Sequence, residues 1–131
     1  MSAAEVYEPA SFVLEATGGR PLTINQVAKM HRQAWASHTR ITREEWWALA
    51  LQARLPRMQR AVVEVTPLHQ TFRSPQDVAA CAPAAKAAID GLVTAGVLPD
   101  DNPEHLLAVT FLPPDVCGVD GLRIRITKVA A

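Results

Sequence analysis

A run of small and apolar residues between Ala84 and Asp101 constrains the fold of this chain most strongly. Alanine and leucine dominate its first half and favour a helix, while Gly96 suits the left-handed turn that often follows a helix end. Lys86 and Asp90 lie four residues apart and therefore share one face of the predicted helix. The residues expected to enter a core are Ile89, Leu92 and Val93. The run predicts a helix buried on one side, with one ion pair on its surface.

Two adjacent carboxylates, Asp100 and Asp101, follow this helix directly after Pro99. With Asp77 and Asp90 they occupy the two ends and one face of the same predicted helix, so the fold could bring several of them within coordination distance. Carboxylate oxygens are the ligands that Mg²⁺ prefers, and such a cation can neutralise phosphate charge and activate water. From the residues alone, a surface ion pair followed by a polar turn is the simpler interpretation.

The length of 131 residues suits one domain spanning residues 1–131. Hydrophobic residues make up 49% and charged residues 20%, which is typical of a globular protein. No apolar run approaches the roughly 20 residues that cross a bilayer, and residues 1–9 contain glutamates but no basic residue, unlike a signal peptide. We therefore expect a cytoplasmic protein with no membrane partner. Cys81 and Cys117 form no Cys-x-x-Cys pair, so we expect reduced thiols.

The formal net charge is zero, but the charges are unevenly distributed. Residues 18–60 contain eight basic and two acidic residues, a local charge of +6. Residues 74–131 contain four basic and seven acidic residues, a local charge of −3. Such a chain can bind a polyanion through its basic half and a cation through its acidic half.

Hydrophobic patterning predicts four strands, at residues 11–16, 60–67, 106–112 and 122–128. A helical region begins at Thr23, which has capping-box spacing, and runs to Leu55. Thr42 begins a second capping-box spacing, so this region is either one helix or two helices that meet near residues 37–39. The resulting order, β-α-β-α-β-β, predicts a single α+β domain, a mixed sheet with helices packed on one side.

The helical region carries a purely basic stripe. Drawn as one helix at about 100° per residue, it places five basic residues within roughly 80° of arc: Lys29, Arg32, Arg40, Arg43 and Arg54. A purely basic stripe suits contact with phosphates, whereas an ordinary solvated face, which is the alternative, mixes both signs of charge. The residues expected to face the core are Val27, Met30, Ala34, Ile41, Ala48 and Leu49. Trp35, Trp46 and Trp47 are expected to be core anchors, with stacking on unpaired bases as the alternative.

The central run resembles the core of RusA-type Holliday-junction resolvases, small endonucleases common in phages and prophages. The resemblance rests on Lys-Ala-Ala-Ile-Asp-Gly-Leu from Lys86 and on Ala-Gly-Val-Leu-Pro-Asp-Asp ending at Asp101, and it extends to Pro-Leu-Thr-Ile-Asn from Pro21. It covers roughly residues 20–128. It implies a homodimeric endonuclease that uses Mg²⁺ or Mn²⁺ to resolve branched DNA, and it favours contact between the basic stripe and the DNA phosphates over a merely solvated face. The implied catalytic residues are Asp77, Lys86, Asp90 and Asp101, and the implied metal ligands are Asp77, Asp100 and Asp101.

The chain departs from this family just before the lysine. Family members usually carry Asp-x-Asp-Asn-x-x-Lys, and the two acidic positions are Ala80 and Ala82 here. Asp77, nine residues before Lys86, is the nearest upstream acid. Either an insertion moves Asp77 into the metal site, or a carboxylate has been lost, which leaves a protein that binds branched DNA with weak or absent nuclease activity. A third alternative is a small interaction protein whose alanine-rich helix is the partner surface.

Overall fold

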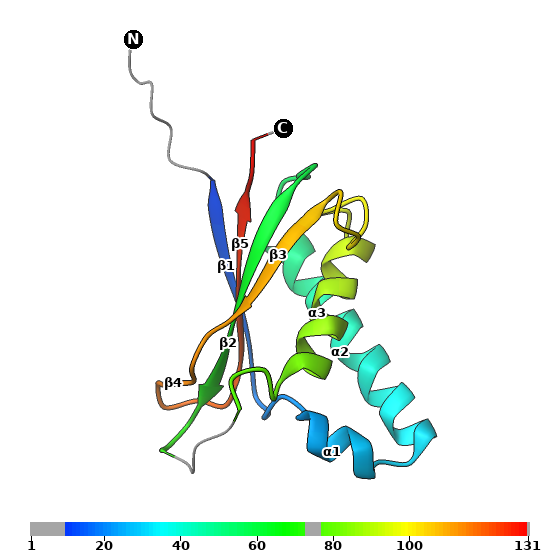
Figure 1. Ribbon diagram of the computed structural model, residues 1–131, viewed down its shortest axis with the longest axis vertical. Coiled ribbons are helices and arrows are strands. Elements are labelled where there is room, and N and C mark those ends of the chain that lie inside the picture. The colour runs from blue at the N-terminus through cyan, green and yellow to red at the C-terminus, as the bar shows by residue number, and fades with distance from the viewer. Residues whose placement is uncertain (1–9, 73–76, 131) are drawn as a thin grey trace.

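The sheet of this protein contains parallel and antiparallel strand pairs, and its helices cover one face (Figure 1). The computed structural model describes residues 10–72 and 77–130. The elements in chain order are β1 (Ser11–Thr17), α1 (Ile24–Lys29), α2 (Arg32–Gln52), β2 (Ala61–His69), α3 (Ala82–Thr94), β3 (Leu106–Phe111), β4 (Asp115–Val116) and β5 (Gly121–Lys128). The sheet order is β1-β5-β2-β3, with β4 beside the end of β2. Strand β5 is antiparallel to β1 and β2, whereas β3 and β4 are parallel to β2. The predicted α+β class is confirmed.

Strands β1, β2, β3 and β5 lie where patterning predicted them, with ends shifted by no more than two residues. Strand β4 was not predicted, because a two-residue strand has too few residues to show an alternating pattern. The observed order is therefore β-α-α-β-α-β-β-β. Across the described ranges, no helix combines the length and the hydropathy that crossing a membrane requires.

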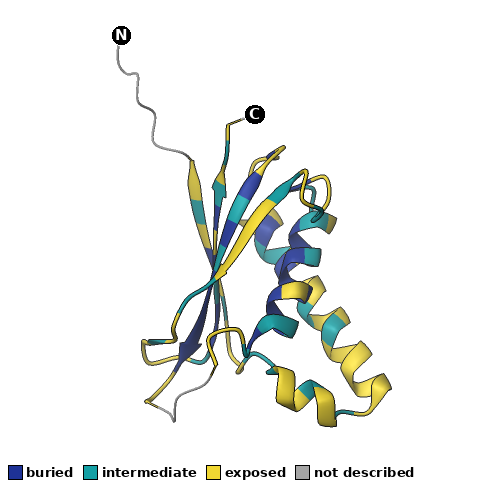
Figure 2. Cartoon of the chain, viewed as in Figure 1, coloured by how far each residue is buried: buried dark blue, intermediate teal, exposed yellow. Residues whose placement is uncertain are grey.

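The core lies between the sheet and α3, as the burial colours show (Figure 2). Strand β5 turns alternate apolar residues inward, and β2 adds Val63 and Val65 beside them. Helix α3 faces these strands with alanines and with Leu92, which is fully buried. The small alanine side chains let the helix backbone approach the sheet closely. The inward-facing residues of β5 are Leu122, Ile124 and Ile126.

The helical region forms two helices that separate at Met30 and His31. Thr23 caps α1 with both bonds of a capping box: its Oγ1 accepts from the Gln26 amide at 3.2 Å, and its own amide donates to Gln26 Oε1 at 2.9 Å. The His31 Nδ1 atom caps α2 by accepting from the Gln33 amide at 3.1 Å. The predicted junction near residues 37–39 is therefore wrong. The second capping signal fails because Thr42 lies inside α2, with its hydroxyl 3.4 Å from His38 Nδ1.

The buried face of α2 differs from the predicted one. Trp46 and Ala50 are buried, whereas Ile41, expected in the core, is 60% exposed. The prediction failed because Ala34, Ile41 and Ala48 share a face of α2 by spacing, whereas packing against α3 at Gly91 buries the face that carries Trp46 and Ala50. Trp46 is a core anchor, as predicted, but Trp35 and Trp47 are 44% and 42% exposed, and for these two residues the prediction is wrong.

The first two turns of α2 are exposed throughout and extend past the start of α3 (Figures 1 and 2).

Helix α3 crosses α2 at Gly91. A Cβ atom on this residue would overlap the Arg43 carbonyl oxygen and lie 2.9 Å from the Trp46 Cβ atom, so only glycine permits this close approach. The helix ends as predicted, since Gly96 has a φ of 87° and follows the last turn. Its start at Ala82 is slightly earlier than the predicted Ala84. The crossing fixes the position of α2 against the second half of α3.

Candidate functional site

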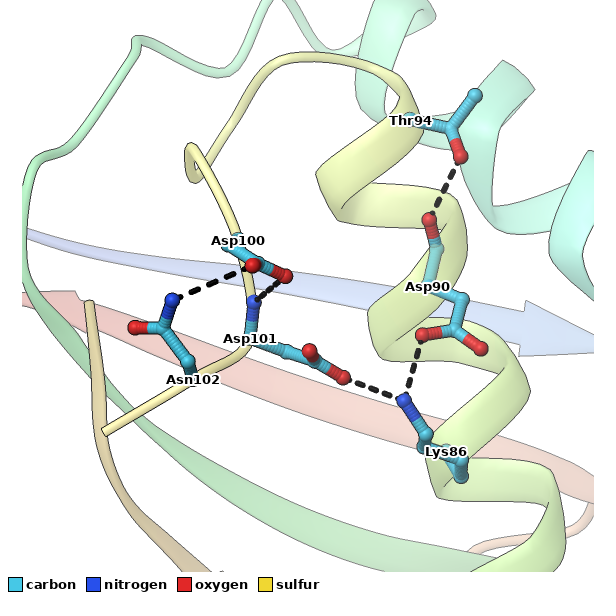
Figure 3. Close-up of polar contacts among 6 residues, drawn as sticks. All are labelled: Lys86, Asp90, Thr94, Asp100, Asp101 and Asn102. Carbon is cyan, nitrogen blue, oxygen red and sulfur yellow. Dashed lines mark hydrogen bonds and ion pairs between the residues drawn. The ribbon is translucent and has the colours of Figure 1, made fainter. Parts of the chain in front are cut away.

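Lys86 joins two carboxylates that lie far apart in sequence (Figure 3). Its Nζ atom donates to Asp90 Oδ1 at 2.8 Å, one helical turn further along α3, and also donates to Asp101 Oδ2. Asp101 lies in the loop after α3, and the close packing of Val97 and Leu98 in the core holds that loop against the helix. The four-residue spacing predicted the contact of Lys86 with Asp90. The contact with Asp101 depends on the fold of the loop.

The carboxylate of Asp100 is used within its own loop. Its Oδ1 accepts from the Asp101 amide at 2.8 Å and its Oδ2 accepts from Asn102 Nδ2 at 3.2 Å (Figure 3). On the helix side, the Thr94 hydroxyl donates to the Asp90 carbonyl at 2.9 Å. The two bonds to Asp100 shape the turn that presents Asp101 to Lys86, and both Asp100 oxygens are directed to the loop rather than to the lysine.

Hydrogen bonds set the charge states of this cluster. Those to Asp101 and then Asp90 raise the pKa of Lys86, and the bond from Lys86 lowers the pKa of Asp101. Lys86 and Asp101 are therefore both charged at neutral pH. The Lys86 side chain is 63% exposed, so each pair contributes only about 0–1 kcal/mol to stability. The arrangement places a cation and two carboxylates at the surface without being a major stabiliser of the fold.

The described residues do not assemble the predicted metal ligands. Asp77 lies exposed in the turn before α3, where its carbonyl accepts from the Ala80 amide at 2.9 Å. In residues 10–72 and 77–130, no three His, Cys, Asp or Glu side chains form a group that could hold a metal ion, so Asp77, Asp100 and Asp101 do not come together. Instead, the Lys86 ammonium occupies the position between two carboxylates where a cation would be held. In this arrangement an ammonium group, and not a set of three convergent carboxylates, joins Asp90 and Asp101.

Ala82 lies close to this cluster. Ala82 shares with Lys86 and Asp101 a groove of about 240 Å³ between α3 and β3, which we call the α3–β3 groove. A carboxylate at residue 82, as in the resembled family, would therefore stand beside Lys86 and Asp101. Alanine leaves that wall apolar. The remaining residues that line the groove are Ala85, Ile89, Leu106, Val109 and Phe111.

Arginines and tryptophans share an exposed side of α2, which we call the α2 basic face: Arg32, Trp35, Arg40, Arg43 and Trp47. The first four line a shallow hollow of about 480 Å³, and Trp47 follows one turn after Arg43. None of the three arginines has an ion-pair partner among the residues that the structure describes. Their positive charge is therefore available to a ligand.

The other two predicted DNA contacts lie outside this helix. Lys29 is in the last turn of α1, and Arg54 follows the end of α2 with a φ of 53°. Both side chains are exposed. A single continuous helix would place all five residues in one stripe, and the structure retains three of them on one helix.

Sequence reasoning missed the exposure of Trp35 and Trp47 and the apolar wall of the α3–β3 groove. The spacing of Arg40, Arg43 and Trp47 at i, i+3 and i+7 could have revealed the mixed basic and aromatic face. The groove had no comparable signal, because it depends on the pairing of β3 with β2. A scan against protein-family models finds no match to this chain, and a search of curated proteins finds none either.

Proposed function

We propose that this protein binds branched DNA through the α2 basic face and acts as a homodimer. The observation that carries the proposal is the set of three exposed arginines and two exposed tryptophans on one side of α2. Arginine guanidinium groups bind phosphate oxygens, and aromatic rings stack on bases that lack a stacking partner. Both features occur where duplex arms meet, since the phosphates converge and bases at the branch are accessible.

The resemblance of residues 84–101 to RusA-type resolvases supports a branched substrate rather than plain duplex. A four-way junction has paired, symmetry-related strands, and a two-fold dimer presents two copies of the α2 basic face to them. The zero net charge weakens general attraction to DNA, so binding rests on this local face. Analytical ultracentrifugation with and without junction DNA measures whether the protein is a dimer, as the proposal expects.

The main test compares a synthetic four-way junction with duplex DNA of the same arm sequence, by fluorescence anisotropy over a series of salt concentrations. The protein is expected to favour the junction. Arg40→Ala with Arg43→Ala should weaken binding to all junction sequences alike and flatten the plot of log affinity against log salt by about one unit per lost contact. Arg125→Ala with Lys128→Ala, on β5, is the control and should leave the slope unchanged. An unchanged slope in the α2 double variant would show that this face is only solvated.

A second candidate function is Mg²⁺- or Mn²⁺-dependent cleavage of the bound junction, and the convergence of Asp90 and Asp101 on Lys86 favours it. The Lys86 ammonium would bind the charge on a phosphate, and the two carboxylates hold that ammonium in place. Nicking is measured separately from binding on the same junction. Asp101→Asn and Asp90→Asn should abolish nicking and leave binding intact or stronger, because they remove negative charge near phosphate. If both variants keep full nicking activity, the cluster of Lys86, Asp90 and Asp101 is not the cleavage site.

Two further measurements examine the role of Asp77 in cleavage. Crystals soaked in Mn²⁺ show directly whether a metal is held by Asp77 with Asp100 or Asp101. If Asp77 is not a ligand, Ala82→Asp should increase Mn²⁺ affinity, measured by calorimetry, because it places a carboxylate beside Lys86 and Asp101. Wild-type nicking that needs Asp77 would support the enzyme, whereas binding without nicking would support the DNA-binding function alone.

A further inference from the structure

Strand β3 ends the sheet with an open edge. It pairs with β2 on one side, and among the described residues no strand pairs with its other side. The β3 segment contains no charged residue and no proline, which are the features that usually protect an edge from further pairing. Strand β1, the opposite edge of the sheet, differs, since its Glu15 is bonded to Arg123 Nε at 2.7 Å. The open edge of β3 is therefore suited to strand addition.

The α3–β3 groove runs beside this edge. Its walls are Ala82, Ala85 and Ile89 from α3 and Val109 and Phe111 from β3, and they are almost entirely apolar. A strand added to β3 would turn every second side chain toward α3. Apolar side chains of that strand would thus enter the groove while its backbone completes the hydrogen bonds of the β3 edge.

The rim of the groove is acidic. Asp90, Asp100 and Asp101 lie close to Lys86, so three negative charges and one positive charge give a local charge of −2 (Figure 3). Asp101 lines the groove itself. A basic occupant therefore complements the rim. A second copy of β3 added antiparallel would instead bring the segment after its own Phe111, which contains two prolines, toward this rim, without a counter-charge.

We propose that the α3–β3 groove binds an extended segment of a partner protein by strand addition to β3. The segment alternates apolar residues with others and carries lysine or arginine at the end that lies beside Asp101. This interaction uses a different surface from the α2 basic face and does not depend on DNA binding.

The test uses a fluorescein-labelled synthetic peptide of alternating valine and threonine with lysines at one end, and a second peptide in which glutamates replace the lysines. Fluorescence anisotropy at low salt should show binding of the lysine peptide, with the glutamate peptide weaker by at least about tenfold. Val109→Asp should weaken the lysine peptide by at least about tenfold, because Val109 is 37% exposed in the groove. Val13→Asp, at an exposed valine of β1, is the matched control and should bind as the wild type does.

Val109→Thr, which keeps a β-branched side chain at the same groove position, repeats the test with a smaller expected loss if Val109→Asp does not fold, which far-ultraviolet circular dichroism reports. Equal binding of the two peptides, or no binding of the lysine peptide, would overturn the proposal. It would also be overturned if wild-type protein sediments as a dimer and the β3 variants sediment as monomers, since a second copy would then occupy the edge. The affinity of the same variants for the four-way junction is measured in parallel. A loss of peptide binding with unchanged junction affinity then concerns the groove alone and leaves the proposed DNA binding untouched.

Discussion

Replacing Gly91 with alanine tests whether the crossing of α3 and α2 holds the α2 basic face in position. The added Cβ atom would overlap the Arg43 carbonyl oxygen, and it would lie 2.9 Å from Trp46 Cβ and 3.0 Å from the Trp47 amide nitrogen. These atoms belong to the backbone or are bonded directly to it, so no rotamer change relieves the contact. The two helices must separate.

The expected magnitude follows from two opposing effects. Overpacking of a core costs about 1–3 kcal/mol, whereas alanine inside a helix is favoured over glycine by about 1 kcal/mol. Because the clash is with backbone, we expect a cost at or slightly above the upper end of this range and a net loss of about 2 kcal/mol. For a chain of this length, that loss lowers Tm by about 6–8 °C.

Urea unfolding followed by circular dichroism measures this loss, and thermal unfolding measures the shift in Tm. Gly19→Ala is the matched control, because nothing lies within 4 Å of the place that its new methyl carbon would take, and its effect should stay within about 0.5 kcal/mol. Junction affinity should fall as well in Gly91→Ala, since Arg43 and Trp47 move with the α2 backbone. A Gly91→Ala protein as stable as the wild type, or more stable, would refute the close crossing.

Three further substitutions test other contacts. Lys86→Met should reduce the loss of stability on acidification: Lys86 lowers the folded-state pKa of Asp101, so its contribution is complete above the unfolded value of about 4 and is lost as pH falls through the lowered value. Urea unfolding between about pH 6 and pH 2 measures this, and equal losses in both proteins would contradict it. Thr23→Ala should cost about 1 kcal/mol and speed hydrogen exchange in α1, and unchanged exchange would argue against the capping box. Trp46→Ala should cost about 3–5 kcal/mol and Trp47→Ala less than about 1 kcal/mol, and similar losses would contradict their different burial.

Local patterns predicted most of the fold. The alternation in β5 and the β-branched run in β2 located those strands, because their side chains meet the core on one face. The helical break could not be placed, because the two capping-box spacings, at Thr23 and Thr42, do not mark the start of α2. His31 caps α2 through a ring nitrogen, which is an uncommon capping group.

The candidate site was predicted only in part, for a similar reason. The contact of Lys86 with Asp90 follows from helical periodicity, whereas the contact with Asp101 depends on how the loop after Gly96 returns along α3. Burial of Trp46 rather than its neighbour Trp47 is decided by the crossing at Gly91, which no pattern within α2 records. Contacts between distant segments were beyond what a local pattern determines.

The exposed start of α2 affects the energetics of any ligand that binds there. The turns from Arg32 to His38 rest on little tertiary packing, and an isolated helix of this length is marginal in water. Their free energy of local opening is therefore far below that of the turn at Trp46, and their amides should exchange first. A ligand that binds there must hold these turns in the helical conformation, and this ordering costs free energy. The observed affinity is therefore weaker than the contacts alone would give. Ser37→Ala, which favours the helix, should then strengthen binding without adding a contact.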